Sequence, residues 1–269
     1  MRRAAAVCVL AVMACAAACA RSDQPPAAGP VLVFAASDLR HALADVARRY
    51  RAAGGDSVTL VFGSTGDLTT QIANGAPADL FFAANAAAID TLAAHRLVVD
   101  DTRAVYAVGR LALVARCAAE SADADSVPDA SRCPTPTLAD LAAPAVHVVA
   151  IADPAHAPYG RAAQQALERA GLWARVQPKL VLGANITQAY QFVETGNADV
   201  GLVALSHVLA TPGRPYTLVD STLHDPLRQT VAALTTGPHR TAAVRFLRYV
   251  EGDAGQAIMR GYGLARPVP

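Results

Sequence analysis

A chain of 269 residues with 53% apolar and 17% charged side chains is long enough to bury the core of one or two globular domains. Its formal net charge is only +1, so it offers no basic field with which to hold a nucleic acid. Aromatic residues make up 5% of the chain, which leaves little material for stacking bases or for a sugar-binding platform.

The first 20 residues predict a signal peptide. Two arginines open the segment, and residues 4–18 form an apolar run too short to span a bilayer comfortably. Two processing sites fit the sequence: an A-x-A cleavage site that ends at Ala20, or a permissive lipobox that would leave Cys19 lipidated. We favour the lipoprotein because residues 21–29 resemble a polar, proline-rich tether. With either processing site, we expect the protein to leave the cytoplasm.

The stretch from Val31 to Leu43 predicts a buried strand, a tight turn and an amphipathic helix. A continuous apolar run stops at Ser37 and Asp38, and beyond it apolar residues recur at near-helical spacing. We expect Ser37 or Asp38 to cap the helix by accepting a backbone N–H bond. Such a helix start presents unpaired N–H groups and the positive end of a dipole, which makes it a natural seat for an anion.

Strand and helix units then alternate along the chain. We expect strands over residues 58–62, 79–84, 105–116, 146–151, 180–182, 199–205, 216–219 and 231–234. We expect helices beginning near residue 68, over 86–95, around 163–170, from about 185 to 195, from 206, and over 240–250 and 253–260. This alternation favours parallel α/β sheets.

The number of units exceeds what one small sheet would hold, so two lobes are the economical interpretation. We assign residues 30–107 and 225–269 to lobe I and residues 108–224 to lobe II. Cys117 and Cys133, the two cysteines outside the signal peptide, flank a small, polar and acidic stretch that predicts an exposed loop. In an oxidising compartment we expect a disulfide worth on the order of 3 kcal/mol. A zinc pair is the weaker alternative, because the spacing matches no zinc pattern.

Four strand-to-helix turns offer hydroxyl groups and free backbone N–H groups without a Lys or Arg. They contain Ser37; Ser64, Thr65 and Gly66; Tyr159 and Gly160; and Asn185, Ile186 and Thr187. In open α/β folds ligands bind beyond the carboxyl ends of the strands, so four turns from two lobes can converge on one cleft. Neutral donors of this kind suit a compact dianion, whose charge is met by dipoles. Taken singly, each turn is better explained as ordinary capping.

Asp38 is the difficulty in this set. A carboxylate within about 4 Å of a dianion would cost several kcal/mol in a partly buried site. We therefore assign Ser37 to the ligand and expect Asp38 to cap its own helix, away from the anion. The alternative is that Asp38 binds a cation or an amine.

Common enzyme motifs are missing from the sequence: it contains no G-x-S-x-G, no H-E-x-x-H, no G-x-x-x-x-G-K, and no G-x-G-x-x-G after a strand. Of the seven histidines, His156 is the one near the expected cleft. A secreted α/β enzyme would have to use Asp38, Asp153 and His156, and those side chains would have to meet within hydrogen-bond reach.

Several motifs resemble the periplasmic molybdate-binding proteins of ABC transporters. They are F-A-A-S-D-L at 34–39, G-S-T-G at 63–66, Q-I-A-N-G-A-P-A-D-L-F at 71–81 and D-P-A-H-A-P-Y-G at 153–160. The resemblance runs from about Val31 to Leu264 in the same order, and the N-G-A-P-A-D-L-F string is its most specific piece. It implies a two-lobed periplasmic binding protein fold of the α/β class, in which each lobe is a mostly parallel sheet flanked by helices and the ligand lies in the interlobe cleft.

By the same resemblance, the protein is a monomer without catalysis or cofactor that captures molybdate or tungstate and delivers it to a membrane permease. The implied oxyanion contacts are Ser37 with Asp38 adjacent, Thr65 with Ser64, and the backbone N–H groups of Tyr159 and Ile186. No side chain is expected to bind the molybdenum or tungsten atom of the oxyanion directly.

Two departures from the family pattern matter. Better-known members carry A-A-S-L, so Asp38 falls where their serine would be. They also carry a tyrosine in the turn where this chain has Ala204, so Ser206, Asn185 or Gln188 would have to substitute. A carboxylate in the cleft would also suit a protonated, phosphate-like ligand, so a binding protein for another small oxyanion or solute is the second hypothesis.

Overall fold

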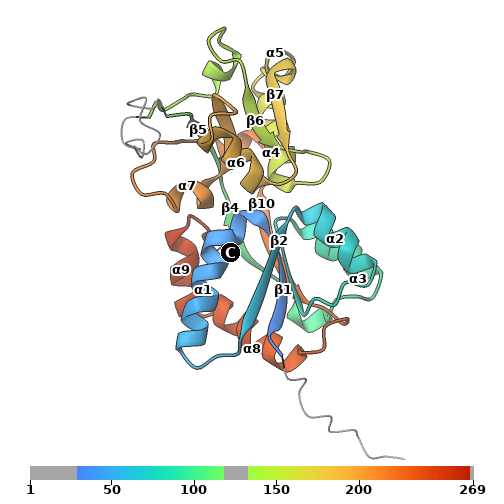
Figure 1. Ribbon diagram of the computed structural model, residues 1–269. Helices are drawn as coiled ribbons and strands as arrows, with labels where there is room; N and C mark the ends of the chain where they lie inside the picture. The colour runs from blue at the N-terminus through green and yellow to red at the C-terminus, as the bar shows by residue number, and fades with distance from the viewer. Residues whose placement is uncertain (1–28, 118–132, 267–269) are drawn as a thin grey trace, which may run out of the picture.

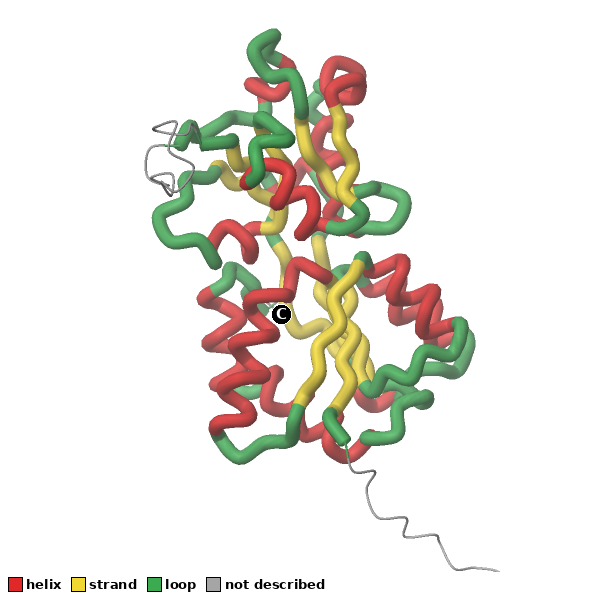
Figure 2. Tube along the Cα trace, in the orientation of Figure 1, coloured by secondary structure: helices red, strands yellow, loops and turns green. Residues whose placement is uncertain are grey.

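The computed structural model describes residues 29–117 and 133–266, which form two lobes stacked one above the other (Figure 1). The predicted signal peptide, nearly all of the tether and the stretch between the two cysteines lie outside the described residues. Each lobe contains a five-stranded sheet with helices on both faces (Figure 2). The predicted α/β class is therefore confirmed.

The sheet of lobe I has the strand order β2-β1-β3-β10-β4. Its strands are β1 (Val31–Ala36), β2 (Val58–Gly63), β3 (Leu80–Ala83), β4 (Ala104–Gly109) and β10 (Leu227–Ala233). β1 pairs in parallel with β2 and β3, whereas β10 pairs antiparallel with β3 and β4, so β10 alone runs against the other four. The sheet is thus mostly parallel.

The helices of lobe I divide between the two faces of its sheet. They are α1 (Arg40–Ala52), α2 (Thr65–Ala73), α3 (Ala86–Ala94), α8 (Arg240–Glu251) and α9 (Asp253–Gly261). Leu43, Phe246 and Met259 bring α1, α8 and α9 into one apolar cluster, whereas Ile72 and Ile89 bring α2 and α3 into another. This packing fixes the starts of α1 and α2 at the edge of the sheet that faces lobe II (Figure 1).

Lobe II repeats the arrangement with the strand order β7-β6-β8-β5-β9. Its elements are β5 (Leu111–Ala115), β6 (Val149–Ala152), β7 (Leu180–Gly183), β8 (Val200–Ala204), β9 (Thr217–Leu218), α4 (Pro158–Arg169), α5 (Trp173–Val176), α6 (Ile186–Glu194) and α7 (Leu205–Leu209). β5 runs against the other four strands. Short 3-10 turns complete the two lobes: η1 (Ser37–Leu39), η2 (Asp100–Thr102), η4 (Ala139–Ala142), η5 (Gln177–Lys179) and η6 (Ser221–Leu223).

The chain passes between the two sheets at Arg110, which lies between β4 and β5, and returns through residues 219–226 to β10. The sequence predicted one strand over residues 105–116, and that prediction is wrong: β4 and β5 are separate strands in different sheets. The apolar run is nearly continuous, so hydrophobicity alone could not mark the change of sheet. Helix α2 also begins three residues earlier than expected, because Ser64 caps it by accepting the N–H of Asp67 at 3.1 Å.

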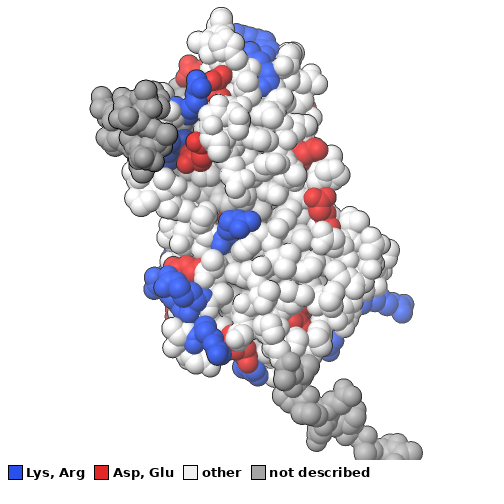
Figure 3. All heavy atoms as spheres, viewed as in Figure 1, with Lys and Arg blue, Asp and Glu red and all other residues white. Residues whose placement is uncertain are grey.

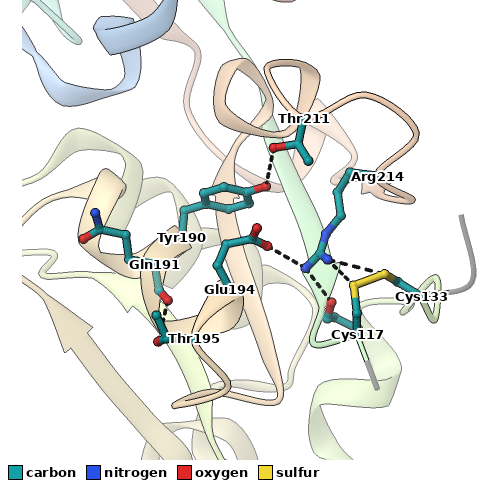
Figure 4. Close-up of polar contacts among 9 residues, drawn as sticks. Cys117, Cys133, Tyr190, Gln191, Glu194, Thr195, Thr211 and Arg214 are labelled. Atoms are coloured by element: carbon teal, nitrogen blue, oxygen red, sulfur yellow. Dashed lines mark hydrogen bonds and ion pairs between the residues drawn. A yellow bond between two sulfur atoms is a disulfide. The ribbon is translucent and has the colours of Figure 1, made fainter. Parts of the chain in front are cut away.

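Cys117 and Cys133 form the predicted disulfide. The buried guanidinium of Arg214 lies against both sulfurs, donates to the carbonyl oxygen of Ala115 at 2.8 Å and pairs with the carboxylate of Glu194 at 2.9 Å (Figure 4). Arg214 therefore ties the disulfide to β5 and α6. Of the helices in the described ranges, none combines the length and apolarity that crossing a bilayer requires.

Candidate functional site

A small pocket lies where the two lobes meet, and its empty space, with its open mouth included, is about 190 Å³. Six of the predicted site residues line it, together with small apolar residues and glycine: Ser37, Asp38, Ser64, Thr65, Tyr159 and Ile186. The first four come from lobe I and the last two from lobe II. No Lys, Arg or His is among the described residues that line the pocket. On the face in Figure 3, Lys and Arg lie mainly at the top and along the left side, with one near the middle, and most of the surface is uncharged.

The hydroxyl groups of lobe I are buried donors. Ser37, Ser64 and Thr65 are each no more than 3% exposed. The Thr65 hydroxyl oxygen accepts the N–H of Ala84 at 3.1 Å, and the Ser64 oxygen accepts a backbone N–H as the helix cap. With one acceptor site of each oxygen occupied, both O–H hydrogens can still be donated to a guest.

The contribution of lobe II comes from two helix starts. Tyr159 is the second residue of α4, after Pro158 at the first position, and Ile186 is the first residue of α6. The first N–H groups of an α-helix have no intrahelical acceptor, so the N–H groups of Tyr159 and Ile186 point outward as donors. Proline suits its place because it has no N–H to satisfy. The positive ends of α4 and α6 add to that of α2 at the same pocket.

Asn185 lies outside the pocket lining. Its side-chain oxygen accepts the N–H of Gln188 at 3.1 Å and so caps α6. The other two candidates to replace the family tyrosine are engaged as well: the Ser206 hydroxyl donates to the Asp38 carbonyl oxygen at 2.6 Å, and the Gln188 side chain accepts the N–H of Ala184 at 2.6 Å. The geometry does not favour a ligand contact from these three side chains.

Direct hydrogen bonds hold the lobes together around the pocket. The Gly66 N–H donates to the carbonyl oxygen of His156 at 2.9 Å, and the Thr187 hydroxyl donates to the carbonyl oxygen of Ser37 at 3.2 Å. A Cβ atom at Gly66 would lie 2.8 Å from the same His156 oxygen, so only glycine lets the two backbones approach this closely. The structure is therefore the closed arrangement of the lobes.

Asp38 does not cap its helix, and that prediction is wrong. Neither Ser37 nor Asp38 makes a side-chain cap, because the chain enters α1 directly through the 3-10 turn η1. The carboxyl group instead faces the lobe interface, where its Oδ2 accepts the hydroxyl of Tyr159 at 3.1 Å and the amide Nε2 of Gln229 at 2.6 Å. Burial raises the pKa of Asp38 to about 7, although these two hydrogen bonds act to lower it.

The sequence analysis did not identify three residues near Asp38 and Tyr159: Gln229, Tyr106 and Gly109. The Tyr106 hydroxyl donates to the Gln229 Oε1 at 3.4 Å, and a side chain at Gly109 would collide with the Tyr159 hydroxyl. A polar Gln229 inside the apolar strand β10 was the available signal, since a fully buried amide needs partners.

The side chains of the enzyme hypothesis have other partners. Asp153 accepts the N–H of Ala155 at 2.9 Å, and His156 is 55% exposed with its ring nitrogen 3.9 Å from Asp67. Asp38 contacts neither of them in the hydrogen bonds described above. The described residues also contain no group of three or more His, Cys, Asp or Glu side chains placed to hold a metal ion.

Comparisons with known proteins agree with this geometry. Residues 31–265 match the family of bacterial extracellular solute-binding proteins. The chain is 35% identical over 239 residues to the molybdate-binding protein ModA of Rhodobacter capsulatus, covering 89% of each chain. It is 36% identical over 240 residues to that of Azotobacter vinelandii, covering 88% of this chain and 90% of the relative. The solved periplasmic molybdate-binding protein of Azotobacter vinelandii superposes with a TM-score of 0.77 at 25% identity, over 88% of this chain and 100% of that one.

Proposed function

Because this chain belongs to the family of bacterial extracellular solute-binding proteins, we propose that it captures molybdate or tungstate outside the cytoplasm and delivers it to an ABC permease. One observation carries this proposal: hydroxyls and helix starts from both lobes converge on one buried pocket whose described lining contains no cationic side chain. Two of its relatives are named molybdate-binding proteins, which supports the choice of anion.

The physical basis is that dipoles replace the water around a small dianion. Each helix start contributes about 0.3–1 kcal/mol toward a nearby negative charge, and more where it is partly buried. Hydrogen bonds to a charged acceptor add about 1.5–3 kcal/mol each. Three buried hydroxyls and the N–H groups of Tyr159 and Ile186 give the pocket enough donors for an oxyanion without direct contact to the metal.

Closure couples binding to delivery. A guest held by donors from both lobes binds the closed arrangement better than the open one, and so shifts the population toward it. The closed form is then what the permease recognises. We propose that the protein acts as a monomer, is exported by its signal peptide, and is retained at the membrane through a lipid on Cys19.

A thermal-shift panel with molybdate, tungstate, chromate, sulfate and phosphate tests the function. A ligand at 100 times its dissociation constant stabilises a protein by about 2.7 kcal/mol. We expect large shifts of the unfolding temperature with molybdate and tungstate alone. An equal shift with sulfate would contradict the specificity, and a shift with phosphate alone would favour the phosphate-like ligand that the Asp38 carboxyl could accommodate.

A further inference from the structure

The two carboxyl oxygens of Asp38 have different surroundings. Oδ2 accepts two donors, the Tyr159 hydroxyl and the Gln229 amide. Oδ1 is buried and has no hydrogen-bond partner among the described residues. Asp38 lines the pocket and is 1% exposed, so Oδ1 is the oxygen left for the pocket's occupant.

An ionised carboxylate and an oxyanion can both only accept hydrogen bonds, so they cannot face each other without a hydrogen between them. We propose that Oδ1 of Asp38 carries this hydrogen in the bound state and donates it to the oxyanion, so that capture of a dianion takes up about one proton from the solvent. No covalent bond to the anion forms. This inference rests on the proposed function, because it needs an oxyanion in the pocket.

The neighbouring groups fix which oxygen holds the proton. The Tyr106 hydroxyl donates to Oε1 of Gln229, which turns the Gln229 NH₂ group toward Asp38. Oδ2 is therefore the acceptor oxygen of a neutral carboxyl group, and Oδ1 its hydroxyl. A carboxylic acid kept neutral in a site of low polarity is an effective hydrogen-bond donor. Burial already raises the pKa of Asp38 to about 7, and a dianion beside it acts in the same direction.

No other titratable group near Asp38 is expected to take up this proton when the anion binds. Tyr159 on α4 and Tyr106 on β4 face Asp38, and burial holds the pKa of both well above the ordinary value, so both stay neutral. His207 on α7 is also buried, which lowers its pKa to about 3. Arg40 and His41 on α1 and Arg228 on β10 are exposed, and Arg110, which directly follows β4, is half-buried.

The direction of the pH dependence follows from these pKa values. Above pH 7 the free carboxyl group is mostly ionised, whereas the bound one is protonated, so binding consumes a proton and weakens as the pH rises. The dissociation constant should rise about tenfold per pH unit there. The dissociation constant should level off only at a lower pH, where the carboxyl group of the ligand-free protein is protonated as well.

Calorimetric titration of molybdate into the mature protein at pH 8.5, in buffers of different ionisation enthalpy, measures the proton directly. We expect an uptake of about one proton per anion for the wild type and about zero for Asp38→Asn, whose amide supplies a permanent hydrogen. Asp153→Asn is the matched control, because Asp153 caps its own turn outside the pocket lining and should leave the uptake at about one.

Each outcome separates this inference from the function on which it rests. Molybdate binding with no proton uptake in the wild type, or with equal uptake in Asp38→Asn, overturns the inference and leaves the function standing. Absence of binding by any oxyanion overturns the function. If Asp38→Asn does not bind molybdate, the pH profile of Gln229→Leu tests the inference instead. This variant removes a donor to Oδ2, which should raise the pKa of Asp38, so its affinity should begin to fall at a higher pH than that of the wild type. An unchanged pH profile in that variant also overturns the inference.

Discussion

Tyr159 of lobe II donates its hydroxyl to the Oδ2 of Asp38 in lobe I at 3.1 Å, and both side chains are almost completely buried. The same tyrosine presents its backbone N–H at the start of α4. One residue therefore joins the two lobes with its side chain and faces the pocket with its main chain. Gly109 makes this possible, since any side chain there would occupy the space of the Tyr159 hydroxyl.

Replacing Tyr159 with Phe should weaken molybdate binding about fivefold, because the closed form loses one interlobe hydrogen bond worth about 1 kcal/mol. Calorimetric titration measures the change. Tyr190→Phe is the matched control, since the Tyr190 hydroxyl bonds to Thr211 within lobe II at 3.2 Å (Figure 4). Equal affinity in both variants would remove the interlobe bond from the account.

Thr65→Val should reduce molybdate affinity at least tenfold at nearly constant volume, because it deletes a buried hydroxyl donor at the pocket. The variant also leaves the Ala84 N–H without its acceptor, so its unfolding free energy should fall by about 1–3 kcal/mol. Thr70→Val, on the exposed side of the same helix, should bind like the wild type. Unchanged affinity in Thr65→Val would exclude the Thr65 hydroxyl as a ligand contact.

Gly66→Ala should impair closure without unfolding lobe I. The added Cβ would lie 2.8 Å from the carbonyl oxygen of His156 in lobe II, and the interlobe backbone bond would have to lengthen. We expect a dissociation constant at least tenfold higher, consistent with about 1.4 kcal/mol lost from the closed form. Gly261→Ala provides the control, since a Cβ there meets no atom within 4 Å. Wild-type affinity in Gly66→Ala would mean that this contact does not limit closure.

Arg214→Met should lower the unfolding free energy by about 1–3 kcal/mol, because it leaves the buried Ala115 carbonyl oxygen without its partner, whereas the partly exposed Glu194 carboxylate can be hydrated. Urea denaturation measures the loss. Arg169→Met, which breaks an exposed pair with Asp225, should cost less than about 1 kcal/mol. Similar losses in the two variants would show that the buried position of Arg214 adds nothing.

Much of the fold follows from local pattern. The alternation of apolar runs and capped helix starts predicted the strands and helices of both lobes, because each unit buries one face in its own sheet. The passage of the chain from one sheet to the other at Arg110 could not be predicted from local pattern. It depends on which partner strands β4 and β5 find, and those partners, β10 and β8, lie far along the chain.

The site likewise has a part that follows from local sequence and a part that depends on residues far apart in the chain. The strand-to-helix turns that contain Thr65, Tyr159 and Ile186 were predicted, because such a turn is a local feature. The surroundings of Asp38 were not, since Tyr159 and Gln229 are 121 and 191 residues away from it. The electrostatic argument that kept Asp38 away from the anion assumed an ionised carboxyl group, and burial weakens that assumption by raising its pKa.

Anomalous scattering from tungsten in crystals of the tungstate complex tests the central claim most directly. We predict one strong peak in the pocket between Thr65, Tyr159 and Ile186, with contacts from both lobes and none from a Lys or Arg side chain. A peak at another surface, or a cationic side chain in contact with the anion, would contradict the account.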